Sequence, residues 1–284
     1  MRYLVTGANG YLGRGITKKL LDDGHEVIAT DLNIDLVDGR AQRIKADLFS
    51  IKDPFEYFGN PDMLVHLAWR NGFVHNHNSH IDDLNLHMNF IELLLKSGLK
   101  NISIMGSVHE VGFYEGSIDE NTPCNPQSMY GISKNALRQI TELLCKKYNA
   151  RLQWLRAFYI VSNEEYGNSI FSKITKAANN NEVSFPFTLG QNQFDFLSYN
   201  DFCEQVVAVT QQKEYNGIIN VCSGYPEKLA DRVQRFIDEN NLNIKLEYGA
   251  FPDRPYDSKA IWGNNTKIKA IMEKYYDKKN STLY

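Results

Sequence analysis

A glycine-rich turn near the N-terminus constrains the fold more than any other stretch. Residues 2–6 form a short apolar run typical of a buried strand, and Gly7, Gly10 and Gly13 follow it. An amphipathic segment, residues 16–21, begins directly afterwards. A strand that turns through glycines into a helix presents backbone N–H groups and the positive end of the helix dipole to the turn. The sequence therefore predicts a diphosphate site whose ligand is a dinucleotide.

An acidic residue follows the second predicted strand. Residues 26–30 (EVIAT) read as a buried strand, and Asp31 ends the run. A carboxylate in the ~20-residue range beyond the glycines suits hydrogen bonds from the adenosine ribose hydroxyls, and its charge repels the extra phosphate of NADP. We therefore expect NAD, although Arg40 and Arg43 leave NADP possible. An ordinary aspartate in a surface turn is the alternative.

Strand-like and helix-like runs alternate along the first half of the chain, which predicts an α/β fold with right-handed crossovers. Residues 63–68 are continuously apolar, as in a parallel strand buried on both faces. The expected architecture is a Rossmann-type doubly wound parallel sheet with a small C-terminal substrate lobe. Further strands are predicted over residues 43–46, 102–105, 152–158 and 218–222, and helices over 84–95, 130–148, 202–211 and 266–276.

Charge and composition exclude several classes of partner. The formal net charge of the 284 residues is −3 and the charges are dispersed, so we expect neither a nucleic-acid nor a membrane partner. No apolar run approaches the ~20 residues of a membrane span, and no signal-peptide pattern precedes the first strand, which predicts a cytoplasmic protein. The four cysteines, scattered without a CxxC pair, are expected to be reduced and mostly packing residues.

Three histidines, His75, His77 and His80, lie close together in a polar loop. They have neither the spacing of ligands on a helix nor an accompanying set of carboxylates or cysteines. We therefore expect no metal site. The favoured interpretation is a mobile loop over the mouth of the active site.

A tyrosine and a lysine lie at helical spacing in the segment 130–148. Tyr130 and Lys134 are four residues apart and so share one face of a helix. The reference pKa of tyrosine is ~10, so a phenolate near neutral pH requires the pKa to fall by ~2–3. The Lys134 ammonium and a nicotinamide's positive charge could together supply that fall. Tyr130 then becomes a general acid/base, and Ser107 could hydrogen-bond the same reacting oxygen. An ordinary exposed helix pair is the alternative.

Together these motifs resemble the extended short-chain dehydrogenase/reductase family, in particular the NAD-dependent epimerase/dehydratase group that acts on nucleotide sugars. The order and spacing of the motifs match over residues 1 to about 160, and weaker matches continue to about 270. The motifs are TGANGYLG at 6–13, Asp31, Asp47-Leu48, HLA at 66–68, Ser107, and P-x-x-x-Y-x-x-x-K at 126–134.

The resemblance implies roles for these residues. Tyr130 would donate or accept the proton, Lys134 would bind the nicotinamide ribose and lower the tyrosine's pKa, and Ser107 would orient the reacting oxygen. Residues 1–162 would form the NAD-binding Rossmann domain, with 195–222 returning to it, and residues 163–194 and 223–284 would form the substrate lobe. The cofactor residues implied are Gly7, Asn9, Gly10, Tyr11, Leu12, Gly13, Asp31, Asp47, Leu48, Leu67, Ala68 and Lys134.

The second half of the chain holds weaker matches to substrate-binding positions. Asn168 resembles an asparagine that opens a lobe helix and contacts the diphosphate, with a helix cap as the alternative. Arg254 resembles a late arginine that binds the same diphosphate, followed by the acid Asp257, with a surface salt bridge as the alternative. The chain departs from the family at two places, because Tyr159 replaces an asparagine and Phe194 stands where many members have arginine. Asp201 is expected to cap the helix 202–211.

The residues after Ser107 bear on the reaction. Dehydratases of the family place Asp-Glu there, whereas this chain has Val108 and His109, which argues against dehydration. We expect His109 to pack, or to make a polar contact with the substrate, rather than to donate a proton. Reduction of a 4-keto nucleotide sugar and 4-epimerisation both remain, and the small lobe slightly favours the reductase. A non-catalytic, dinucleotide-sensing regulator is the third alternative. By the resemblance, helices 84–95 and 130–148 would form a homodimer.

Overall fold

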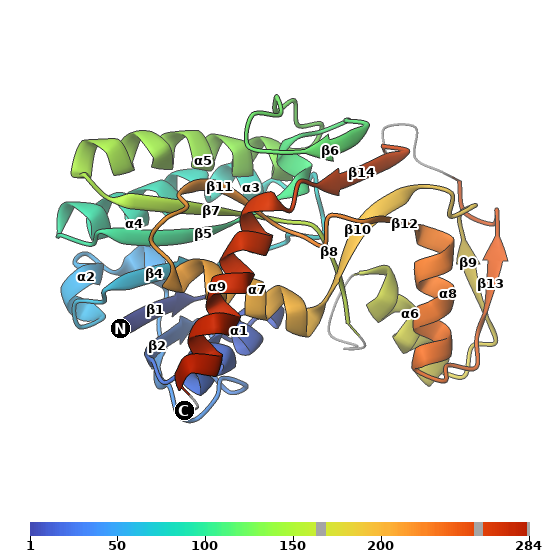
Figure 1. Ribbon diagram of the computed structural model, residues 1–284, viewed down its shortest axis with the longest axis horizontal. Helices are drawn as coiled ribbons and strands as arrows, with labels where there is room; N and C mark the ends of the chain where they lie inside the picture. Colours follow the sequence, from blue (N-terminus) through green and yellow to red (C-terminus); the bar gives the residue numbers. More distant parts are fainter. Residues whose placement is uncertain (163–168, 253–257, 283–284) are drawn as a thin grey trace.

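The computed structural model describes residues 1–162, 169–252 and 258–282, and its centre is a seven-stranded parallel sheet (Figure 1). The strand order is β11-β7-β5-β4-β1-β2-β3, and neighbouring strands pair in parallel. The order reverses beside β1, as in a doubly wound sheet, so the predicted Rossmann-type architecture is confirmed. The strands are β1 (Arg2–Thr6), β2 (Glu26–Asp31), β3 (Gln42–Lys45), β4 (Met63–His66), β5 (Asn101–Ser107), β7 (Arg151–Ala157) and β11 (Gly217–Val221).

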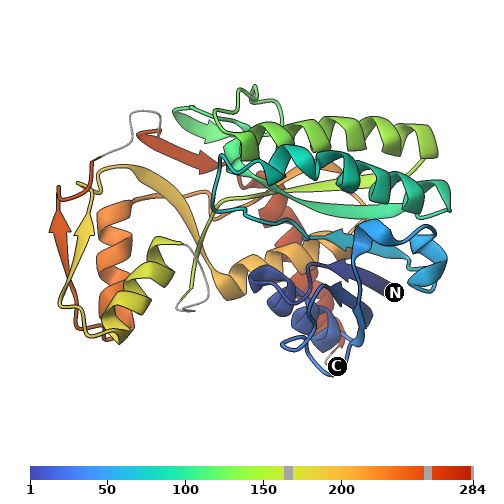
Figure 2. The same cartoon turned by 180° about the vertical axis from the view of Figure 1, so that it is seen from behind.

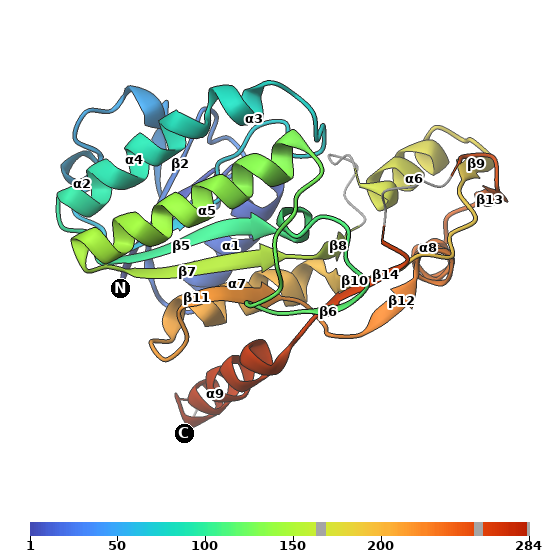
Figure 3. The ribbon, with the colours of Figure 1, turned by 90° about the horizontal axis from the view of Figure 1, so that it is seen from above.

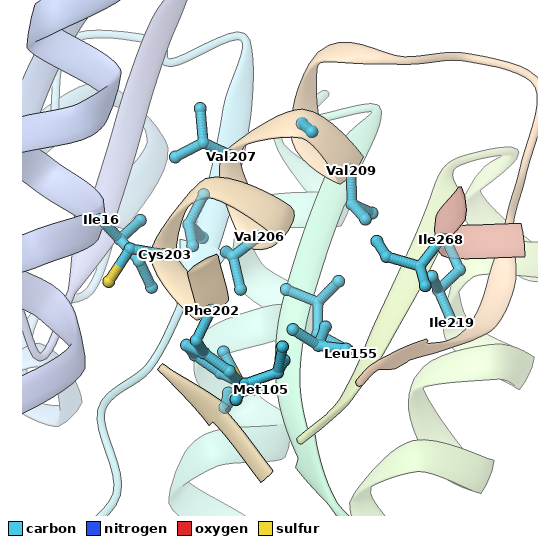
Figure 4. Packing of buried hydrophobic residues seen from close by; sticks show 14 of the residues in the cluster. Ile16, Met105, Leu155, Phe202, Cys203, Val206, Val207, Val209, Ile219 and Ile268 are labelled. Atoms are coloured by element: carbon cyan, nitrogen blue, oxygen red, sulfur yellow. The ribbon is translucent and has the colours of Figure 1, made fainter. Parts of the chain in front are cut away.

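Helices cover both faces of this sheet (Figure 3). One face carries α1 (Tyr11–Asp22), α7 (Tyr199–Gln211) and α9 (Thr266–Thr282), and the other carries α4 (Leu84–Lys96) and α5 (Met129–Tyr148). Figure 4 shows the core under the first face, where Ile16 of α1 and Phe202 of α7 lie with Leu155 of β7. Short helices complete the layers: η1 (Leu48–Ser50), α2 (Pro54–Tyr57), α3 (Ser79–Asp82) and η2 (Val108–Glu110).

A second, smaller sheet lies beyond the carboxyl ends of the central strands (Figures 1 and 2). Its order is β12-β10-β14-β6, and β8 pairs with β10 off this path. Beyond it, helices α6 (Ile170–Asn179) and α8 (Leu229–Glu239) pack around Phe171 and Phe236, beside a parallel strand pair. The strands are β6 (Gly116–Ile118), β8 (Tyr159–Val161), β10 (Gln193–Ser198), β12 (Pro226–Lys228) and β14 (Ala260–Gly263), with β9 (Ser184–Phe187) and β13 (Lys245–Tyr248) in the pair.

Two boundaries differ from the sequence-based expectation. Helix α9 was expected in the substrate lobe, but it packs against α7 and β11 of the central domain and continues to Thr282. Helix α7 begins at Tyr199, and its cap is Ser198 rather than Asp201. The Ser198 hydroxyl accepts the Asp201 N–H at 3.1 Å and donates to the Asp201 carboxylate at 2.7 Å, so the acid supports the cap from the first turn. Within the described residues, none of the helices has the length and apolarity needed to cross a membrane.

Candidate active site

The glycine turn connects β1 to α1 with no room for side chains. Gly7 has a φ of 68°, and a Cβ atom there would lie 2.7 Å from the Ala68 nitrogen. A Cβ on Gly13 would lie 2.1 Å from the Gly7 carbonyl oxygen. No side chain in the described part of the chain caps α1 at Gly10, so the first turn of the helix presents backbone N–H groups to a ligand. This tight turn fits the diphosphate of a dinucleotide.

Helix α7 holds the first turn of α1 in place. The Tyr199 hydroxyl accepts the Gly15 N–H at 3.0 Å and donates to the Tyr11 carbonyl, while the two tyrosine rings lie 4.6 Å apart. Leu12 packs against the core under the same face. The sequence analysis missed Tyr199, because its contact with α1 depends on the return of the chain to the central domain.

Asp31 lies at the end of β2, beside the turn. Its carboxylate accepts the Asn9 N–H at 3.0 Å and the Leu32 N–H at 2.7 Å. The Asn9 side chain accepts the Leu36 N–H at 2.8 Å, which ties the loop after β2 to the turn. The Arg40 guanidinium binds Asp22 and Asp38, at 2.8 and 2.7 Å, rather than lying free.

The other predicted cofactor residues lie along the same edge of the sheet. Asp47 caps η1 by accepting the Phe49 N–H at 3.1 Å, and Leu48 is buried in the core. Leu67 and Ala68 directly follow β4 and lie against Gly7. The turn, the acid at the end of β2 and the chain after β4 form a continuous edge that fits NAD. The residues predicted to hold NAD therefore lie together along this edge.

Ser107, Tyr130 and Lys134 are brought together at the carboxyl end of β5. Ser107 ends the strand, while Tyr130 and Lys134 lie in the first two turns of α5. The Ser107 side chain hydrogen-bonds Tyr130, and the Lys134 ammonium donates to the Met105 carbonyl at 2.8 Å. Lys134 is 3% exposed, which is unusual for an ammonium.

Burial shifts the pKa values of Tyr130 and Lys134, and the shift of Tyr130 is opposite to the one expected from the sequence. Dense packing raises the pKa of Tyr130 to about 12, and this outweighs the hydrogen bond from Ser107, which lowers it. Burial lowers the pKa of Lys134 to about 7, against the opposing charge of Glu110. The expected fall in the tyrosine's pKa counted on the nicotinamide charge as well as the ammonium. With the chain's own groups alone, the pKa of Tyr130 rises instead of falling, since a buried phenolate loses its hydration.

A buried carboxylate lies behind Ser107. Glu110 accepts the Ser107 N–H at 2.6 Å and the Trp154 indole N–H at 2.9 Å, and it lies 3.9 Å from Arg156. Burial raises the pKa of Glu110, although the Arg156 charge opposes this. Ser107 and Glu110 form a capping box around η2, and the S-x-x-E spacing could have revealed it in the sequence.

The histidine loop surrounds Tyr130. The ring of His75 lies parallel to the Tyr130 ring with centroids 5.5 Å apart, and His80 and Trp69 lie at 5.3 and 6.2 Å. The loop was expected to lie over the mouth of the active site, and its His75 carbonyl accepts the Tyr130 N–H at 2.8 Å. His77 bonds to Ser79 within the loop. Among the described residues, no cluster of three His, Cys, Asp or Glu side chains is arranged to hold a metal.

A cavity of about 80 Å³ lies between η2 and the smaller sheet. His109 borders it, with its ring 4.3 Å from His75 and 6.0 Å from Tyr130. Tyr159 and Phe194, the two departures from the family pattern, form part of its wall with ring centroids 4.4 Å apart. Asn168, Arg254 and Asp257 lie outside the described residues. The other lining residues are Val108, Gly112, Phe113, Gln127, Ser128, Ser258 and Ile261.

A known protein family matches most of the chain. The model of the NAD dependent epimerase/dehydratase family matches residues 3–222, which cover the glycine turn, the trio and β11. The chain belongs to that family. As a member of this NAD-dependent family it uses NAD, the cofactor that the acid at the end of β2 predicted.

A curated relative matches nearly the whole chain at 41% identity. It is dTDP-6-deoxy-L-talose 4-dehydrogenase (NAD(+)) from Aggregatibacter actinomycetemcomitans, 41% identical over 274 residues, which cover 93% of this chain and 99% of the relative. The fold is also that of UDP-N-acetylglucosamine 4-epimerase from Methanobrevibacter ruminantium, with a TM-score of 0.83 at 20% identity over 95% of this chain and 91% of that one. UDP-glucose 4-epimerase from Thermotoga maritima gives a TM-score of 0.80 at 19% identity, over 95% and 92%.

Proposed function

We propose that the chain is an NAD-dependent oxidoreductase acting at C4 of a nucleotide-activated hexose, with reduction of a 4-keto sugar nucleotide as its reaction. The reverse reaction would oxidise the 4-hydroxyl group. The observation that carries the proposal is the assembly of Ser107, Tyr130 and Lys134 beside a cavity whose wall includes His75 and His109, the rings of which pack near Tyr130. These are the groups that carbonyl reduction requires: a proton donor and a partner that orients the oxygen.

The proposed substrate is a 6-deoxyhexose linked to a nucleoside diphosphate. The name of the 41% identical relative, a dTDP-6-deoxy-L-talose 4-dehydrogenase, supports this class. The apolar side chains of Val108, Phe194 and Ile261 in the cavity wall suit a methyl group at C6. Asn168 and Arg254 remain the proposed ligands of the sugar-nucleotide diphosphate, and His109 a proposed contact to the sugar.

Each residue of the trio has a separate role in the proposal. When bound, NAD(H) supplies or accepts the hydride at C4. The Tyr130 hydroxyl gives its proton to the carbonyl oxygen during reduction and takes a proton from the hydroxyl during oxidation. Ser107 holds that oxygen in line with Tyr130, and Lys134 binds the cofactor ribose. The Tyr130 hydroxyl is a phenol at neutral pH, and packing raises its pKa to about 12, so it holds a proton to donate in reduction.

The proposal is tested by supplying dTDP-4-keto-6-deoxyhexose and NADH to the purified protein. NADH oxidation should match, mole for mole, the formation of a dTDP-6-deoxyhexose identified by mass spectrometry. If the protein instead retains NAD and interconverts C4 epimers without consuming NADH, it is a 4-epimerase. If it binds NADH but neither reduces the 4-keto sugar nucleotide nor interconverts C4 epimers, it is a dinucleotide-sensing regulator. Either result would overturn the reductase.

Two further expectations remain part of the proposal. The proposed homodimer would use α4 and α5, whose outer faces expose the apolar side chains of Leu86, Ile132 and Leu143. Light scattering on the purified protein measures its mass, and a monomer at working concentration would contradict the dimer. The cytoplasmic location expected from the sequence is tested by cell fractionation.

A further inference from the structure

Trp69 contacts the ammonium group of Lys134. The Lys134 nitrogen lies 3.9 Å from the centroid of the Trp69 ring and donates a hydrogen bond to the Met105 carbonyl at 2.8 Å. A distance under ~6 Å from the ring centroid is within the range of a cation–π interaction, and tryptophan is the strongest partner among the aromatic side chains. Trp69 directly follows the HLA motif, and the sequence analysis assigned it no role.

The edge of the Trp69 ring is held by a hydrogen-bond chain. The indole N–H donates to His80 Nδ1 at 3.0 Å, and His80 Nε2 lies 3.0 Å from the Val74 carbonyl oxygen. A carbonyl oxygen only accepts, so Nε2 carries the proton and Nδ1 is the acceptor. His80 is therefore neutral in this arrangement, and burial lowers its pKa. The chain fixes the plane of the indole ring.

The face of the Trp69 ring is held by a second chain. The His87 ring lies nearly parallel to the indole, at 14°, with centroids 4.6 Å apart. His87 Nδ1 lies 2.9 Å from His66 Nε2, and His66 Nδ1 lies 2.8 Å from the Thr6 hydroxyl at the end of β1. The indole is thus fixed relative to the central sheet, and through it the position of the Lys134 ammonium is fixed.

We propose that Trp69 is a positioning residue for Lys134, whose ring holds the buried ammonium in place and favours its protonated form through a cation–π contact. The inference rests on the role of Lys134 in the proposed function. Burial alone disfavours the charged form of a lysine, and the ring quadrupole offsets part of that cost. With the ring removed, the ammonium keeps the Met105 carbonyl but loses its second attractive contact.

Other groups around Lys134 affect the same equilibrium. Glu110 of η2 raises the lysine's pKa, whereas the three buried histidines are neutral and feel the lysine charge as an unfavourable one. The Tyr130 ring centroid is 5.9 Å away. These groups remain in a Trp69 variant, so a change in the titration reports on the indole. The groups that face Lys134 are Glu110 of η2, His66 of β4, His80 of α3, His87 of α4 and Tyr130 of α5.

The test is a pH titration of Lys134 in the purified full-length protein, followed by NMR of ¹³Cε-labelled lysine. Lys134→Met identifies the resonance. In the unsubstituted protein the midpoint should lie at about 7. Trp69→Leu should lower the midpoint by about one pH unit, and Trp69→Phe, which keeps a ring of weaker quadrupole, by about half of that. The measurement needs no sugar nucleotide, so its failure is distinguishable from failure of the proposed function.

Trp262→Phe is the matched control, because Trp262 lies on β14 of the smaller sheet. In this variant the midpoint of the Lys134 titration should equal that of the unsubstituted protein. An unchanged midpoint in Trp69→Leu would overturn the inference. Equal shifts in the Leu and Phe variants would also overturn it, since they would report lost packing rather than the ring. If Trp69→Leu does not fold, Trp69→Phe decides alone: a lower midpoint supports the contact and an unchanged one refutes it.

Discussion

Tyr130 packs against rings from the loop after β4, and burial raises the pKa of its hydroxyl. His75, His80 and Trp69 pack around it, and Ser107 supplies the hydrogen bond to the hydroxyl. The proton that Tyr130 holds at neutral pH is the one that a carbonyl oxygen needs during reduction. In the proposed reaction this is the proton that Tyr130 would give to the substrate.

The first prediction concerns the Tyr130 hydroxyl. Tyr130→Phe should lower kcat for NADH oxidation by about 10²–10⁴-fold, because the variant keeps the ring packing and loses only the proton donor. The dissociation constant of NADH, measured by fluorescence, should change little. Tyr276→Phe, on the exposed side of α9, is the control and should retain full activity. Turnover of Tyr130→Phe close to that of the unsubstituted protein would contradict the proposed chemistry.

At this scale the sequence predicted the residues of the trio and missed their surroundings. Ser107, Tyr130 and Lys134 follow from strand-end position and helical spacing, which are local properties of the chain. The contacts of Trp69 and His75 depend on the path of a loop whose residues have no regular period. The lowered pKa of Lys134 was missed for a related reason, since burial is a property of the assembled site.

At the scale of elements, the loop after β4 caps the N-terminus of α5. Three N–H groups of the first helical turn have partners: Met129 donates to the Asn76 side chain at 3.1 Å, Tyr130 to the His75 carbonyl, and Gly131 to the Ser128 hydroxyl. Orphan donors of a helix terminus are satisfied here by a distant segment. The helix that carries Tyr130 and Lys134 is therefore fixed by the loop that carries Trp69.

The second prediction follows from that cap. Asn76→Ala removes the acceptor for the Met129 N–H and should lower the free energy of unfolding by ~1 kcal/mol. Asn76→Asp keeps an acceptor oxygen, so its free energy of unfolding should differ from that of the original protein by only ~0.3 kcal/mol. Urea denaturation followed by circular dichroism measures both. Equal losses in the two variants would show that the side-chain acceptor does not stabilise the helix.

The smaller sheet depends on one buried carboxylate. Asp195 of β10 is fully buried and accepts the backbone N–H groups of Ser223, Gly224 and Gly263, at 2.7 to 3.1 Å, and the Ser223 hydroxyl. It thereby joins β10 to β14 and to the turn after β11. The sequence analysis placed Asp195 in the return to the central domain, but this role requires the pairing of strands far apart in the chain.

The third prediction is that Asp195→Ala unfolds the smaller sheet or lowers the free energy of unfolding by ~3 kcal/mol or more, because several buried donors lose their acceptor. Asp195→Asn keeps one acceptor oxygen and should lose less. Thermal melts of the two variants give the comparison. If Asp195→Ala is as stable as Asp195→Asn, the carboxylate is not what joins the strands.

At the scale of the whole molecule, the site lies where the two sheets meet, and each sheet contributes a different part of it. The central sheet and the helices that cover it supply the glycine turn, Asp31 and the trio, whereas β8, β10 and β14 supply Tyr159, Phe194 and Ile261 to the cavity. The parallel sheet could be predicted because its strands are locally apolar and alternate with helices. The smaller sheet could not be predicted from the sequence, since it takes β6 from before α5 and its other strands from after β7.

The last prediction concerns the stability of the whole chain in acid. His66 and His87 are buried and bonded to each other, and burial lowers both pKa values, that of His87 to about 3. Below the ordinary histidine pKa of ~6.5, the unfolded chain takes up protons that the folded chain refuses. The stabilisation is therefore complete above pH 6.5 and is lost as the pH falls. Each histidine should remove up to ~2 kcal/mol between pH 6.5 and pH 5.

His87→Phe tests this directly, because it keeps an aromatic ring against Trp69 and removes one of the two titrating groups. The variant should be less stable than the original protein at pH 7, since His66 loses its partner. Between pH 7 and pH 5, however, the free energy of unfolding of the variant should fall less than that of the original protein. The two losses should differ by up to ~2 kcal/mol. Urea denaturation at the two pH values gives both quantities. His77→Gln, on the exposed part of the loop, should leave the pH dependence unchanged. A His87→Phe protein that loses as much stability in acid as the original would show that the buried pair does not govern it.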